Sequence, residues 1–128
     1  MSNWSHVAAI VRVDGFPWQS MDVERLFGRT LNWNDDTYAW DAAENNPDDY
    51  LPMGSEGSLQ MSVWTNPDEN CMARWTVSIF GDLWDHHDPE GIIEWFKAKV
   101  GDISFVRNAV IVVNNEWSGK TLTWGLEE

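Results

Sequence analysis

The sequence is poor in cysteine and in long apolar runs, and each shortage excludes a class of protein. One cysteine, Cys71, is too few for an intramolecular disulfide or a thiolate metal site, which agrees with a reducing compartment. No apolar run approaches the roughly 18 residues that a membrane span needs, and residues 1–13 lack the basic start of a signal peptide. The sequence therefore predicts a cytoplasmic protein with no membrane partner.

Basic residues are scarce as well. Eight Lys and Arg stand against 21 Asp and Glu, which gives a formal net charge of −13 at pH 7. An acidic surface of this kind repels nucleic acid, so direct binding to nucleic acid is not expected. The ten tryptophans exceed what the core of one small domain needs, and surplus Trp is a preferred anchor of interfaces. These features together favour a protein that binds other molecules.

Recognisable catalytic motifs are missing. There is no GxSxG nucleophile motif, and residues 54–58, GSEGS, lack the lysine of a phosphate-binding loop. With 21 acidic residues, some pair always resembles an acid/base site, so carboxylates alone indicate nothing specific. We therefore predict a non-enzymatic protein without a cofactor.

The stretch GDLWDHHDPEG, residues 81–91, is the place where a metal site would be sought. Asp88 and Pro89 precede an apolar pattern of helical spacing, so they are expected to be the N-cap and first turn of a helix. We interpret the stretch as a loop before that helix. A metal-dependent hydrolase is the alternative, with a weak set of candidate ligands: Asp82, Asp85, His86 and His87, joined by His6 from the first strand.

Hydrophobic periodicity predicts a single domain over residues 1–128 with an α+β fold. The first helix is expected to have Ser20 as its N-cap and to break or end at Gly28. The simplest architecture for this order is a ferredoxin-like split βαβ sandwich, an antiparallel sheet with two helices on one face. The expected elements are strand 5–13, helix 20–31, strands 58–64 and 72–80, helix 90–100, and strands 105–114 and 120–124.

Residues 30–57 follow no strand or helix pattern and are interpreted as a long insertion after the first helix. From Thr30 through Ala73 there are nine acidic residues and no basic ones, and aromatic residues alternate with the acids. Acids around aromatic anchors suit a basic protein surface of the kind that binds nucleic acid. The residues expected to contact such a partner are Asp35, Asp36, Trp40, Asp41, Asp48, Asp49 and Tyr50.

The outer face of the predicted sheet offers an alternative site. Arg12, Trp64 and Arg74 alternate with core positions on three strands, so all three are expected to point outward. Arginines beside an aromatic ring could bind a small anion such as a nucleotide, which the protein would then sequester. We expect the protein to be a monomer or a small homo-oligomer.

Three segments resemble a group of small uncharacterised proteins encoded by bacteriophages and prophages: residues 52–64, PMGSEGSLQMSVW; residues 77–97, VSIFGDLWDHHDPEGIIEWFK; and residues 105–113, FVRNAVIVV. The resemblance covers about residues 52–113 and includes no functional motif. It implies an accessory protein in the cytoplasm of a bacterial host cell, where such proteins often block a host or defence protein. Residues 30–50 of the insertion are not covered by it.

Overall fold

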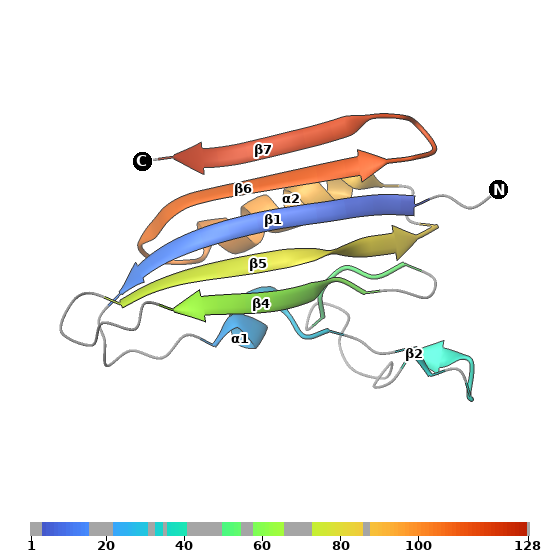
Figure 1. Cartoon of the computed structure of the whole chain (residues 1–128), viewed down its shortest axis with the longest axis horizontal. Helices are drawn as coiled ribbons and strands as arrows, with labels where there is room; N and C mark the ends of the chain where they lie inside the picture. The colour runs from blue at the N-terminus through green and yellow to red at the C-terminus, as the bar shows by residue number, and fades with distance from the viewer. Residues whose placement is uncertain are drawn as a thin grey trace.

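In the computed structural model the described residues are 4–15, 22–30, 33–34, 36–40, 50–54, 58–65, 73–85 and 88–127. They form an α+β fold, as predicted, in which a five-stranded antiparallel sheet carries two helices (Figure 1). The strands of the sheet are β1 (Trp4–Gly15), β4 (Gln60–Thr65), β5 (Ala73–Trp84), β6 (Val106–Asn115) and β7 (Thr121–Glu127). The helices are α1 (Val23–Phe27) and α2 (Pro89–Gly101), and a separate hairpin comprises β2 (Trp33–Asn34) and β3 (Ala39–Trp40).

The first strand in the chain lies at the centre of the sheet, whose order is β4-β5-β1-β6-β7. β1 pairs with β5 along its whole length, from Trp4 opposite Trp84 to Gly15 opposite Ala73. On its other side β1 pairs with β6, where Arg12 lies opposite Asn108 and the next residue of β1 lies opposite Val106. Residue 107 is therefore an extra residue of β6, a β-bulge that turns its side chain out of the regular alternation.

One side of the sheet is buried and the other is exposed. Along β1 the side chains of Val7 and Val11 are buried whereas that of Ile10 is exposed, as the two-residue period of a strand requires. Phe27 of α1 and Phe96 of α2 are fully buried members of one core cluster, so both helices cover the same side. Burial of each phenylalanine contributes roughly 2 kcal/mol of transfer free energy.

The predicted second helix is confirmed as α2. Its N-cap is Asp88, whose Oδ1 accepts a hydrogen bond of 2.9 Å from the backbone N–H of Gly91. Pro89 begins the helix, where its missing N–H leaves no hydrogen bond unmade. Ile92 and Phe96, one helical turn apart, face the sheet.

The first helix is much shorter than predicted. Asp22, rather than Ser20, is the N-cap of α1, and its Oδ1 accepts a 3.2 Å hydrogen bond from the N–H of Arg25. An ionised carboxylate at this position is favoured because it also neutralises the positive end of the helix dipole. The helix ends at Phe27, because Gly28 has a φ of 123°, which no helix can contain.

The architecture differs from the simplest ferredoxin-like arrangement in three respects. β7 extends the sheet by one strand beyond β6, the hairpin of β2 and β3 lies between α1 and β4 in the chain, and α1 has only five residues. The extra strand has a physical cause: Trp124 on β7 packs edge-on against Phe96, with ring centroids 5.8 Å apart. β7 thus widens the sheet that α2 covers.

Candidate binding surfaces

The uncovered side of the sheet is here named the open face. Its centre is apolar and is formed by Ala8, Ile10, Phe80, Val110 and Val112 of the three middle strands. The four larger side chains are 37–44% exposed, although neighbouring strands already enclose their flanks. The space above them is therefore open. A sheet face that is exposed to solvent normally carries polar residues at these positions.

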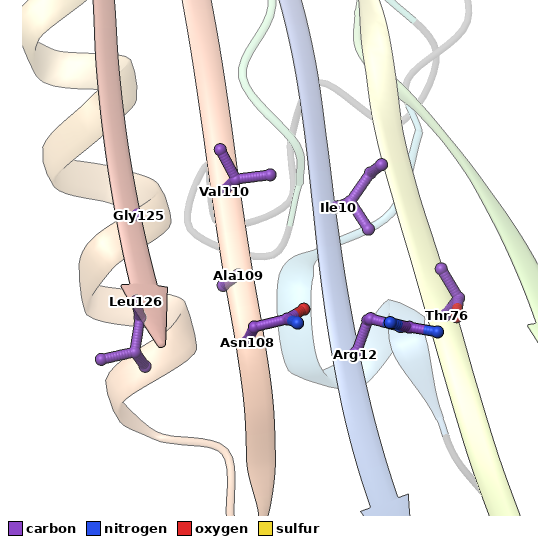
Figure 2. A pocket seen from close by; sticks show the side chains of 8 residues that line it. All are labelled: Ile10, Arg12, Thr76, Asn108, Ala109, Val110, Gly125 and Leu126. Atoms are coloured by element: carbon purple, nitrogen blue, oxygen red, sulfur yellow. The ribbon is translucent and has the colours of Figure 1, made fainter. Parts of the chain in front are cut away.

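A shallow hollow of about 570 Å³ lies on the open face beside this apolar centre. Gly125 of β7 lies opposite Val110 and has no side chain, which leaves room over the sheet. Figure 2 shows Ile10 and Val110 at one end of the hollow, and Arg12 and Asn108 at the other. The hollow therefore joins an apolar wall to a basic and polar one.

Three arginines lie at the end of the open face that contains Arg12 and Asn108. Arg12 of β1 lies opposite Thr76 and Asn108 on the two neighbouring strands. Arg74 of β5 lies opposite Asp14, and the bulged Arg107 of β6 has its Nε 3.8 Å from the same Asp14 carboxylate. We name Arg12, Arg74 and Arg107 the arginine end. Asp14 lies beside these guanidinium groups, and Glu127 of β7 lies opposite Asn108 in the cross-strand row of Arg12, so three arginines and two acidic residues leave this end net positive.

The three residues expected to bind a small ligand lie close together in the sheet. Trp64 of β4 and Arg12 of β1 flank Thr76 of β5 in one cross-strand row, and Arg74 is two residues from Thr76 on the same side of β5. Trp64 is 56% exposed. Diagonal and neighbouring positions in a sheet are within reach of long side chains, so one small ligand could contact all three.

The opposite end of the open face is acidic and contains His6. Its Nδ1 lies 2.7 Å from Oδ1 of Asp82 on β5, and its Nε2 lies 2.7 Å from Oε1 of Glu116, the residue after β6. These hydrogen bonds and the two negative charges raise the pKa of His6 above its ordinary value, while burial lowers it slightly. We name Asp82 and Glu116 the acidic end; a protonated His6 ties their two strands together across β1.

The candidate metal ligands are not brought together among the described residues. Asp82 is a strand residue that contacts His6, and Asp85 lies in the turn after β5 with a left-handed φ of 58°. The two carboxylates bound to His6 lie on opposite ring nitrogens and do not converge on one point. Within the described ranges no three His, Cys, Asp or Glu side chains could hold a metal ion; His86 and His87 lie outside those ranges.

Contacts at Arg29 and Tyr50 hold together the two ends of the acidic segment, defined here as residues 30–49. The backbone N–H of Leu51 donates a 2.9 Å hydrogen bond to the carbonyl of Arg29, and Arg29 and Tyr50 form an isolated parallel bridge. The guanidinium carbon of Arg29 lies 5.2 Å from the centroid of the Tyr50 ring, a cation–π contact. Tyr50 is only 7% exposed, so it anchors the segment and offers little area to a partner.

Besides Thr30, the described part of the acidic segment is the hairpin of β2 and β3, which lies apart from the five-stranded sheet in Figure 1. Trp40 pairs with Trp33 through the backbone. In the turn between the strands Asp36 is exposed, and Tyr38 is 81% exposed with a left-handed φ of 51°. The remaining residues expected to contact a partner lie outside the described residues: Asp35, Asp41, Asp48 and Asp49.

The sequence alone did not predict the roles of two residues on the open face. Glu116 and Arg107 were not considered, because only the register of β6 brings them to His6 and Asp14. The only signal for Arg107 was its place beside a polar Asn108 at the start of an otherwise apolar strand. The 81% exposure of Tyr38 depends on its place in the turn between β2 and β3.

The chain matches no protein-family model, no curated protein and no solved structure. Neither helix of the described chain has the length and apolar character that crossing a membrane requires.

Proposed function

We propose that this chain is a non-enzymatic acidic binding protein, of the kind that bacteriophages encode, which inhibits a bacterial host or defence protein by occupying its nucleic-acid-binding surface. The acidic segment is the part that contacts the target. The observation that carries the proposal is the hairpin of the acidic segment, which presents a nearly fully exposed Tyr38 beside Asp36.

The geometry of the segment supports this role. Because Arg29 and Tyr50 hold its two ends together, the segment leaves and rejoins the domain at one place. Residues 30–49 include six acidic residues and no basic ones. A field of one sign accelerates encounter with a basic surface, and an exposed tyrosine supplies the apolar anchor.

The proposal is tested by neutralising four acids of the segment. The variant carries Asp35→Asn, Asp36→Asn, Asp48→Asn and Asp49→Asn. Wild-type and variant proteins are immobilised, exposed to bacterial lysate at increasing salt, and the retained proteins are identified by mass spectrometry. A target of the segment is expected to bind the variant about tenfold more weakly and with a smaller salt dependence, and to be displaced from the wild type by duplex DNA.

A matched control removes the same number of charges elsewhere. It carries exposed substitutions on and beside the helices: Glu24→Gln, Glu90→Gln, Glu94→Gln and Asp102→Asn. This control is expected to retain the target as the wild type does. If the segment variant and the control retain the same proteins at every salt concentration, the acidic segment is not the binding site.

The open face supports a second candidate function, the sequestering of a small anionic ligand such as a nucleotide. The observation that favours it is the shared row of Trp64, Thr76 and Arg12, with Arg74 beside it and the hollow next to it. Arginine binds phosphate oxygens in a bidentate manner, and tryptophan stacks on a planar base. Binding would raise the melting temperature by mass action.

We further infer that the fold is an elaborated ferredoxin-like split βαβ sandwich. The inference is supported by the succession of β1, α1, β4, β5, α2 and β6, by the antiparallel pairing of β1 with both β5 and β6, and by both helices packing on one core. β7 and the hairpin of β2 and β3 are then additions to this core.

A further inference from the structure

We propose that a second copy of this chain binds the open face, forming a dimer in which the two sheets stack face to face with their β1 strands antiparallel. The arginine end of each copy then lies over the acidic end of the other. The proposal rests on the open face, whereas the proposed inhibitory function rests on the acidic segment, so the two are tested independently.

The open face has an apolar centre with polar groups at its rim. Five apolar side chains are contiguous across three strands, because Ala8 lies between Phe80 and Val112, and Ile10 lies between Ser78 and Val110. An apolar patch of this kind with polar groups at its rim is typical of a protein interface. Stacked sheets bury such residues at a spacing of about 10 Å.

The area of the face is sufficient. Five strands at about 4.8 Å spacing, each with about nine residues that rise roughly 3.3 Å, give a footprint on the order of 700 Å². A standard stable interface buries about 800 Å² on each partner. The open face therefore comes close to the area that a stable dimer needs without any contribution from the loops.

The charge distribution on the open face favours a second copy of the chain as its binding partner. His6 and Arg12 are six residues apart on β1, so the acidic end and the arginine end are separated by roughly 20 Å along the strand. A two-fold axis that crosses β1 at the level of Ala9 exchanges these ends and places Ile10 over Ala8 of the other copy. A surface with opposite charges at equal distances from an apolar centre is complementary to itself.

Asp14 and Glu127 offset part of the arginine end, which keeps a net positive charge. Lys120 lies in the turn after Glu116, and a protonated His6 offsets one of the two carboxylates, so the acidic end is net negative when His6 is neutral. The formal charge of −13 on each chain opposes association, but that repulsion acts over distances longer than the Debye length of about 8 Å at physiological ionic strength and is largely screened. Contacts within the interface are screened much less.

The proposal is tested by exchanging the charges of one end at a time, with the mass measured by sedimentation velocity over the micromolar range at near-physiological salt. The wild type is expected to sediment as a dimer of 14.7 kDa chains. The first variant, Arg12→Glu with Arg107→Glu, has two acidic ends. The second variant, Asp82→Lys with Glu116→Lys, has two basic ends. For each variant alone, the dissociation constant of the dimer is expected to rise more than about a hundredfold, since like charges then face each other.

An equimolar mixture of the two variants gives the decisive result. Each end of one variant then meets an opposite charge on the other, so a one-to-one heterodimer is expected. A matched control, Lys97→Glu with Lys99→Glu on α2, makes the same charge change as the first variant but away from the open face and should remain dimeric. Circular dichroism of each variant confirms that it is folded. Ile10→Lys, at the apolar centre, provides a further monomeric variant that leaves both ends intact.

Three outcomes overturn the proposal. A wild type that is monomeric over the whole range excludes the dimer. A dimer that survives both charge variants and Ile10→Lys uses another surface. If the wild type is monomeric and added ATP raises its melting temperature, with the rise lost in Arg12→Gln, the open face binds a small ligand.

Discussion

At the scale of single residues, His6 is the side chain whose protonation matters most among those described. Its Nδ1 and Nε2 each lie 2.7 Å from a carboxylate oxygen, of Asp82 and of Glu116, and both nitrogens donate a hydrogen bond when the ring is protonated. Its pKa is raised in the folded protein by these hydrogen bonds. A raised pKa means that the protonated form stabilises the fold below the ordinary histidine pKa of about 6.5. That contribution is lost as the pH rises through the raised value.

His6→Gln is therefore expected to lower the free energy of unfolding at about pH 5.5 more than at about pH 8.5, on either side of the ordinary histidine pKa. The difference should reach at most about 1 kcal/mol, because the side chain is 39% exposed and exposed ion pairs are weak. Urea unfolding of both proteins at the two pH values measures it. Equal losses at both values would show that the carboxylates do not bind a protonated histidine.

Some residue roles could be predicted from local sequence and others could not. Asp88 was identified as an N-cap because the cap, the proline and the apolar pattern lie within a few residues of one another. The contacts of His6 join residues that are 76 and 110 positions apart, and only the strand register fixes them. Tyr50 was expected at an interface because its sequence neighbours are acidic, whereas the structure buries it to 7% exposure and places Arg29 over its ring.

At the scale of elements, the most consequential junction is the end of α1. Gly28 has a φ of 123°, and a Cβ at this position would lie 2.7 Å from the carbonyl carbon of Tyr50. The close approach lets Arg29 pair with Tyr50, which fixes where the acidic segment begins and ends. The segment therefore depends on a glycine for its attachment.

Gly28→Ala is expected to destabilise the fold by more than about 1 kcal/mol, because both the backbone conformation and the space disfavour a side chain. Gly101→Ala is the matched control, since no atom lies within 4 Å of a Cβ there and alanine favours a helix over glycine by about 1 kcal/mol. Urea unfolding should therefore show opposite signs for the two variants. A neutral Gly28→Ala would mean that the junction can relax without cost.

Elements with a strong period were predicted well. The strands of the sheet and α2 follow the alternation of their buried side chains, although β5 continues four residues beyond the predicted end, to Trp84. Gly28 was predicted to break or end the first helix, and α1 ends there, whereas the N-cap is Asp22 rather than Ser20, because both residue types favour that position. The hairpin of β2 and β3 has two residues per strand, too few to show any period.

At the scale of the whole molecule, the net charge of −13 dominates. Repulsion among like charges destabilises a compact state, and salt screens it. The acidic segment is a large source of this repulsion, because residues 30–49 include six acidic residues and no basic ones. The sign of the field could be predicted from composition alone, whereas the separation of arginine end and acidic end required the sheet.

Added sodium chloride is therefore expected to raise the melting temperature, by roughly 4 °C for each kcal/mol of repulsion relieved. The variant with Asn at positions 35, 36, 48 and 49 should melt higher at low salt and respond less to added salt. Differential scanning calorimetry at several salt concentrations measures both. A melting temperature that falls with salt would mean that favourable ion pairs outweigh the repulsion.

The central position of β1 in the sheet also affects how the protein folds during its synthesis. β1 leaves the ribosome before the other strands, but its two partners begin only at Ala73 and Val106. At a synthesis rate of roughly 5–20 residues per second, β1 spends several seconds without either neighbour. Its apolar residues from Val7 to Val13 are then exposed on the nascent chain. We expect this strand to be the segment that molecular chaperones protect until β6 has emerged.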